Sequence, residues 1–173
     1  MAQSDRSRSN IKLPPPAPVV ALAGWIVPGL GYILIGERWR GIIAGVTIIL
    51  LYVCGTLIGG VRVVDVPGYD ARGARQMIGN TKKWALTTQP LPEIAEKPWF
   101  MPQVLVGLPT FIASYASLDI APTVQKSRAR LAEIGMIYTV VAGLLNLVIL
   151  IDSGHRSIKQ REELMEKYPH LIG

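Results

Sequence analysis

The sequence has little of what metal binding and disulfide formation usually require. Its 173 residues include one cysteine, Cys54, and two histidines, His155 and His170, which lie near the C-terminal end. One cysteine excludes a disulfide within the chain. Neither histidine has a neighbouring cysteine or the H-E-x-x-H pattern of many zinc sites. We therefore predict no metal site, and we interpret Cys54 as a small apolar packing residue.

Motifs that bind nucleotides or build nucleophiles are also missing. There is no G-x-x-x-x-G-K-[ST] phosphate loop, and Gly29-Leu30-Gly31 lacks a third glycine at dinucleotide-binding spacing. No serine stands in a G-x-S-x-G elbow. The neighbouring carboxylates Glu162 and Glu163 lie on a polar tail rather than in the buried surroundings typical of catalytic acids. We expect no catalytic residue and no cofactor.

Charged residues are absent from two long windows, Gly41 to Val61 and Ile134 to Ile151. A helix of about 20 apolar residues crosses the hydrocarbon core of a bilayer, which is about 30 Å thick. The formal net charge is +6, but Lys and Arg flank the apolar windows and form no aromatic-and-basic strip. This pattern predicts a lipid bilayer as the partner and excludes nucleic acid.

We predict an all-α membrane protein, a bundle of about four transmembrane helices with a short amphipathic C-terminal helix. Lys and Arg favour the cytoplasmic face, and counting them places the N-terminus in the cytoplasm. With four spans the C-terminus lies there too, and with three spans it lies on the other side. The expected regions are a disordered basic tail (1–16), a transmembrane hairpin (17–61), a polar loop (62–98), a third membrane segment that is a span or a re-entrant piece (99–122), a last transmembrane helix (131–152) and an amphipathic cytoplasmic tail (153–173).

The first span contains Pro28 between apolar residues, together with Gly29 and Gly31. Proline has no N–H group and should kink the helix. In lipid the freed carbonyl needs another donor, so the kink should face protein. The alternative is a re-entrant half-helix that turns back before it crosses the bilayer.

Several residues suit the ends of the spans, where lipid headgroups lie. Trp39 is expected at the interface, and Arg38 and Arg40 can extend to headgroups. Asp152 closes the last apolar window and is expected at the same level.

Two G-x-x-x-G pairs mark the second span, Gly41 with Gly45 and Gly55 with Gly59. Small residues four apart let helices approach closely in lipid. We expect these pairs to pack against the protein's own first helix, with self-association as the alternative. Asn146 lies within the last span and should form a hydrogen bond to another helix.

The hairpin motif Pro28-Gly29-Leu30-Gly31-Tyr32, followed by Gly36 and Arg40-Gly41, resembles a bacterial family of small multi-pass membrane proteins of unknown function. Gly31 stands where many relatives have glutamine. The stretch 142–147, followed by Ile151-Asp152, is similar to the closing helix of such a family. The resemblance implies a multi-pass protein of the bacterial inner membrane and implies no chemistry.

We predict a non-enzymatic interaction or scaffold component of a membrane complex, whose partners are other membrane proteins or further copies of the chain. The alternative is a small transporter or channel subunit with a path lined by Pro28 and Asn146. A third possibility, a membrane enzyme, would require a pocket that groups Asp65, Asp70 or Glu93 of the polar loop with a basic residue.

Overall fold

The structure is a computed structural model that describes residues 13–60, 63–64, 77–78, 81–82, 98–119 and 129–169. Its helices are α2 (Ala17–Ile26), α3 (Leu30–Leu34), α4 (Arg38–Gly59), α6 (Phe100–Val104), α7 (Leu108–Asp119) and α8 (Ala129–Lys167). Two-residue strands β1 (Met77–Ile78) and β2 (Thr81–Lys82) pair antiparallel. The predicted disordered tail, up to residue 12, and most of the predicted polar loop lie outside the described residues.

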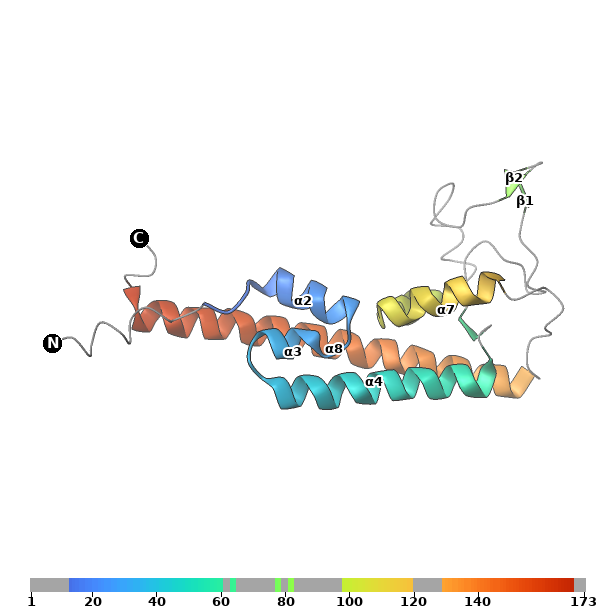
Figure 1. Ribbon diagram of the computed structural model, residues 1–173, viewed down its shortest axis with the longest axis horizontal. Coiled ribbons are helices and arrows are strands. Elements are labelled where there is room, and N and C mark those ends of the chain that lie inside the picture. The colour runs from blue at the N-terminus through green and yellow to red at the C-terminus, as the bar shows by residue number, and fades with distance from the viewer. Residues whose placement is uncertain are drawn as a thin grey trace.

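The long helices α4 and α8 run antiparallel and form the frame of the fold (Figure 1). Both are long and apolar enough to cross a membrane. They approach closely because the glycines Gly55, Gly59 and Gly135 meet at the contact, and a β-carbon on Gly55 or Gly135 would collide with the facing backbone. The two charge-free windows therefore lie on two helices, as the composition indicated.

The chain does not continue through Pro28 as one kinked helix. Helix α2 ends at Ile26, Gly29 has a φ of 85°, and α3 runs back along α2 (Figure 1). The reversal brings Gly31 against the carbonyl of Val20. Pro28 cannot donate the next helical hydrogen bond, and Gly29 accepts a left-handed conformation that other residues disfavour. The predicted span of residues 17–35 is thus a helical hairpin, the shape of the re-entrant alternative.

The segment predicted as a span or re-entrant piece also folds as a helical hairpin. Helix α6 ends at Val104, Gly107 has a φ of 84°, and α7 runs back from it (Figure 1). The backbone of Gly107 lies against the carbonyl of Trp25 so closely that a β-carbon would overlap it. The tips of the two hairpins therefore touch each other, α2–α3 from one end of the frame and α6–α7 from the other (Figure 1).

The two halves of the chain have the same order of elements in opposite directions. Each half has a short helix, a break at a Gly-Leu pair, a short returning helix and one long helix. The pairs are Gly29-Leu30 and Gly107-Leu108. Because α4 and α8 are antiparallel, this order runs in opposite directions in the two halves, a similarity that the sequence patterns did not indicate.

Among the described residues, two helices reach the length of a membrane span, so a four-span bundle is not confirmed. The predicted separate C-terminal helix is also wrong, because α8 continues unbroken from Ala129 to Lys167. Residues 153–167 contain no proline, and Lys, Gln, Arg, Glu, Leu and Met, which favour helices, make up most of 159–167.

Two glycines of α8 provide a matched test of this packing. A β-carbon on Gly143 would overlap the carbonyl oxygen of Pro102, whereas one on Gly154 would meet its nearest atoms, on Ala17, at 4.0 Å. Gly143→Ala should lower the free energy of unfolding by roughly 1–3 kcal/mol through overpacking. Gly154→Ala should leave it unchanged or raise it by up to about 1 kcal/mol, because alanine favours a helix over glycine. Thermal unfolding of the purified variants measures both, and equal midpoints would contradict the close contact of α6 with α8.

Candidate functional site

Asn146 of α8 lies where the two hairpin tips meet, and it is fully buried. Its Nδ2 donates to the carbonyl of Leu105 at 2.7 Å and to that of Gly24 at 3.4 Å. In a helix each of these carbonyls would accept from the residue four positions on. Those residues are Pro109 and Pro28, which have no N–H group. One amide thus supplies a donor to two carbonyls that the prolines leave without one.

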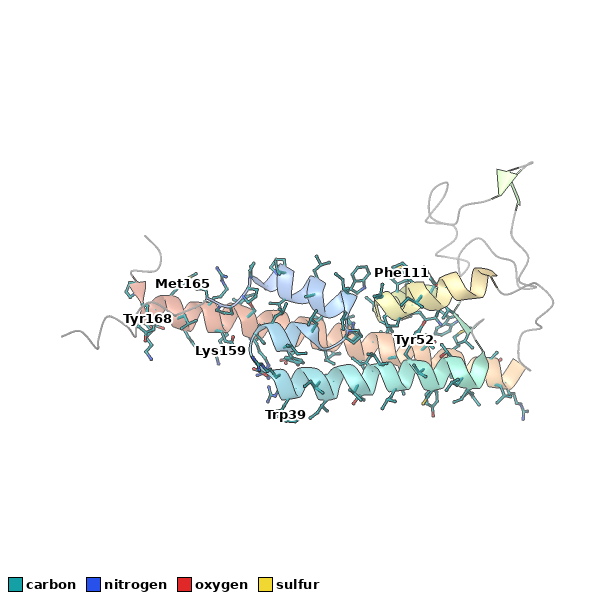
Figure 2. The ribbon with its side chains drawn as sticks, in the orientation of Figure 1. Trp39, Tyr52, Phe111, Lys159, Met165 and Tyr168 are labelled. Carbon is teal, nitrogen blue, oxygen red and sulfur yellow. The ribbon has the colours of Figure 1, made fainter. Side chains whose placement is uncertain are left out.

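Trp25 joins the same tips from the side of α2. Its Nε1 donates to the carbonyl of Val104 at 3.0 Å. Its ring meets Phe111 of α7 edge to face, with 6.1 Å between the ring centroids. Figure 2 shows Phe111 at the end of α7 that faces α2. The indole therefore links the end of α2 to both arms of the second hairpin.

A second buried polar group fastens α6 between α8 and the end of α4. Gln103 donates from Nε2 to the carbonyl of Val63 at 3.0 Å and to Thr139 Oγ1 at 2.9 Å. Thr139 donates in turn to the carbonyl of Met136 at 2.8 Å, and Thr110 donates to that of Gln103. The side chains of Gln103, Thr110 and Thr139 are fully buried. Three of these four bonds end on backbone carbonyls, and the bond from Thr110 joins the two arms of the second hairpin.

One acceptor at the junction has no donor among the described residues. It is Asn146 Oδ1, which is buried. A buried polar atom without a partner costs free energy, so this oxygen is the position in the junction where a small hydrogen-bond donor would be favoured.

A separate ionic network lies at the end of the apolar part of α8. The Tyr32 hydroxyl donates to Asp152 Oδ2 at 2.5 Å, and Arg156 Nε donates to the same oxygen at 2.7 Å. Both contacts hold the pKa of Asp152 below its usual range. Glu37 accepts from Arg40 at 3.1 Å and from Arg156 at 3.3 Å. The network ties α3 and the 36–37 link to α8.

The glycines predicted to pack helices lie in contacts within the chain. Gly41 and Gly45 face Pro28 and Gly29 at the first break, as the expected contact with the first segment requires. Gly55 and Gly59 instead face α8, and Gly31 lies against Ser153.

The predicted interface residues Arg38, Trp39 and Arg40 are exposed, and Asp152 belongs to the ionic network. Pro28 and Asn146 are linked indirectly, because Asn146 donates to the carbonyl of Gly24, which Pro28 leaves without a helical donor. Within the described ranges no three His, Cys, Asp or Glu side chains gather as a metal site would require.

The sequence analysis missed Trp25, Gln103, Thr110 and Thr139. One signal was available for the second break, because Gly107-Leu108-Pro109 repeats the combination of glycine and proline seen at Pro28-Gly29-Leu30. Because Pro109 lacks an N–H group, this combination indicates that the carbonyl of Leu105 needs a donor from elsewhere.

Comparison with known proteins assigns a family but no activity. Residues 19–163 match a family of unknown function, DUF6677. No curated protein and no solved structure matches the chain. The matched range includes Asn146 and all of the helices except the first two residues of α2 and the last four of α8.

Replacing Asn146 tests the junction directly. Asn146→Leu removes the donor of two carbonyls at the junction, and each orphaned group costs about 1–3 kcal/mol, so the free energy of unfolding should fall by roughly 2–6 kcal/mol. Thr47→Val is the control, because the Thr47 hydroxyl binds a carbonyl of its own helix on the exposed side of α4. Its effect should stay within about 0.5 kcal/mol. Equal unfolding midpoints for the two variants would contradict the role assigned to Asn146.

Proposed function

Because the chain belongs to DUF6677, a family of unknown function, its role has to be argued from its own structure, and we propose that it is an integral membrane protein that acts as a non-enzymatic scaffold in a membrane assembly. Different observations support membrane insertion and the scaffold role.

The distribution of polar and apolar side chains carries the first part. Large apolar side chains cover the outside of both long helices, and Leu57 is 78% exposed, Ile151 65% and Ile43 64%. Beside its apolar core, the interior holds fully buried polar residues, namely Gln103, Thr110, Thr139, Asn146, Ser153 and Ser157. In water this arrangement would expose apolar surface that soluble proteins bury. In a bilayer it is favourable, because lipid covers the apolar face and the backbone is satisfied internally.

This distribution and the fold together favour two spans and two re-entrant hairpins. Helix α4, with 22 residues, is about 33 Å long, which matches a bilayer core of about 30 Å. The hairpins then enter from opposite faces and meet near mid-depth at Asn146. Both ends of the chain and the 36–37 link share one face. Lys and Arg divide equally between the faces in this topology, so the charge rule that placed the N-terminus in the cytoplasm gives no preference here.

The length of α8 supports the scaffold role. Beyond Asp152 the helix continues to Lys167 and passes the N-terminal end of α4 (Figure 1). At about 1.5 Å per residue this extension is about 22 Å long. Ser157 and Arg161 donate to the carbonyls of Pro15 and Pro14, so the chain before α2 braces this extension. Its exposed side chains are largely charged and include Lys159, Glu162, Glu163, Glu166 and Lys167. A rigid charged helix outside the bilayer suits binding to a protein partner.

Transport is the second candidate, and Asn146 Oδ1 is the observation that favours it. In many transporters, discontinuous helices of inverted repeats meet at the bilayer midplane and bind the substrate there. Here two such breaks meet beside a buried acceptor that has no donor in the part of the chain that the structure describes. The other polar groups of the junction are engaged with backbone carbonyls, and for this reason we place the scaffold role first.

Purification from the native membrane in mild detergent, with mass spectrometry, tests the scaffold role. A stoichiometric protein partner should accompany the chain and should be lost from Glu162→Lys/Glu163→Lys, which reverses charge on the α8 extension. Glu133→Lys reverses an exposed charge near the other end of α8 and should keep the partner. A pure homo-oligomer, or a partner retained by all variants, would contradict the proposal. A homo-oligomer that also raised the urea permeability of vesicles would establish the second candidate.

A further inference from the structure

An open groove of about 410 Å³ lies where the link between α3 and α4 meets α8. Its lining consists of Gly36, Glu37, Arg38, Trp39, Arg40 and Arg156. Three guanidinium groups and one carboxylate give this lining an excess of positive charge. The groove also lies at the N-terminal end of α4, where the helix dipole has the same sign. An anionic group is therefore the ligand that the electrostatics favour.

Glu37 orients two of the three guanidinium groups. One carboxylate oxygen accepts from Arg40 and the other from Arg156, while Arg156 Nε is held by Asp152. An arginine carries five N–H donors, and these contacts use only some of them. The two side chains are thus fixed in place while they keep donors for another acceptor. Arginine suits phosphate, whose oxygens can accept two parallel N–H bonds from one guanidinium.

The surroundings distinguish a lipid phosphate from a free one. Trp39 is 78% exposed and lies at the N-terminal end of α4, on the side away from α8 (Figure 2). Ile42 and Ile43, about one turn further along, are 47% and 64% exposed and begin the apolar face of the helix. Tryptophan in such a position is typical of the membrane interface. If the phosphate of a lipid lay in the groove, the acyl chains of that lipid would lie beside these exposed apolar side chains.

We propose that this groove binds the phosphate of an anionic phospholipid, with Arg38, Arg40 and Arg156 as the donors. The inference rests on the membrane placement proposed above. The lipid would link α4 to α8 at the headgroup level, where the ionic network already joins them.

Native mass spectrometry of the protein in dodecyl maltoside micelles tests the site with two probes, dioleoyl phosphatidylglycerol and dioleoyl phosphatidylcholine. The wild type should retain one phosphatidylglycerol in clear preference to phosphatidylcholine. Arg38→Gln should weaken that binding about fivefold, the effect expected for one basic residue at an anionic membrane surface. Arg38→Lys keeps the charge and should recover part of the affinity. Arg130→Gln removes an exposed charge near the far end of α8 and should bind as the wild type does.

The possible outcomes separate the site from the membrane placement. Equal retention of the two lipids, or an Arg38→Gln variant that binds as tightly as Arg130→Gln, would overturn the headgroup site. Displacement of phosphatidylglycerol by 10 mM inorganic phosphate would assign the groove to a free anion and overturn the lipid as its ligand. A chain that stayed monomeric without detergent would instead overturn the membrane placement itself.

Discussion

The backbone carbonyls of Gly24 and Leu105 need hydrogen-bond donors where the tips of the two hairpins meet, and the structure depends on how this need is met. Pro28 and Pro109 remove the donors that continuous helices would supply. Asn146 replaces both from a single position on α8. In the bilayer placement that we propose, a backbone carbonyl without a donor would cost several kcal/mol, so hairpins that meet at mid-depth would require such a side chain beside their tips. This requirement for a shared donor joins the two halves of the chain.

Close packing follows from the same requirement. The hairpin tips reach Asn146 only if the backbones approach closely, and glycine stands where they do. Gly107 lies against Trp25, Gly143 against Pro102, and Gly45 against Pro28. Elsewhere, Gln103 and the network around Asp152 hold α6 and α3 to α8. Most of the buried polar groups that the structure describes are engaged internally, and the described surface carries an apolar belt, a groove lined by arginines and the charged end of α8. These surfaces support the contacts with lipid and with a protein partner that we propose.

The sequence was informative where composition alone decides the structure. Windows without charge predict α4 and α8, because a long apolar helix needs no particular contact to be recognised. Pro28 correctly predicted an interruption of the first helix. Asn146 correctly predicted a hydrogen bond from α8 to another helix. Whether a helix kinks or reverses at a proline depends on the partners of the returning segment, such as Ser153 behind Gly31, and one-dimensional spacing does not show these. The roles of Gln103 and Thr139 were missed for the same reason, because their partners are 36 to 40 residues away.

The most direct test of this account is the side of the membrane on which three engineered cysteines react. In a Cys54→Ala background, Trp39→Cys, Pro98→Cys and Lys159→Cys would be labelled one at a time with an impermeant maleimide, in right-side-out and in inverted vesicles, with an N-terminal tag as reference. Two spans with two re-entrant hairpins predict that positions 39 and 159 and the N-terminal tag share one face and that position 98 lies on the other. If position 98 shared the face of the N-terminus and position 39 lay opposite, the first segment would cross the bilayer, and the junction at Asn146 could not form as described.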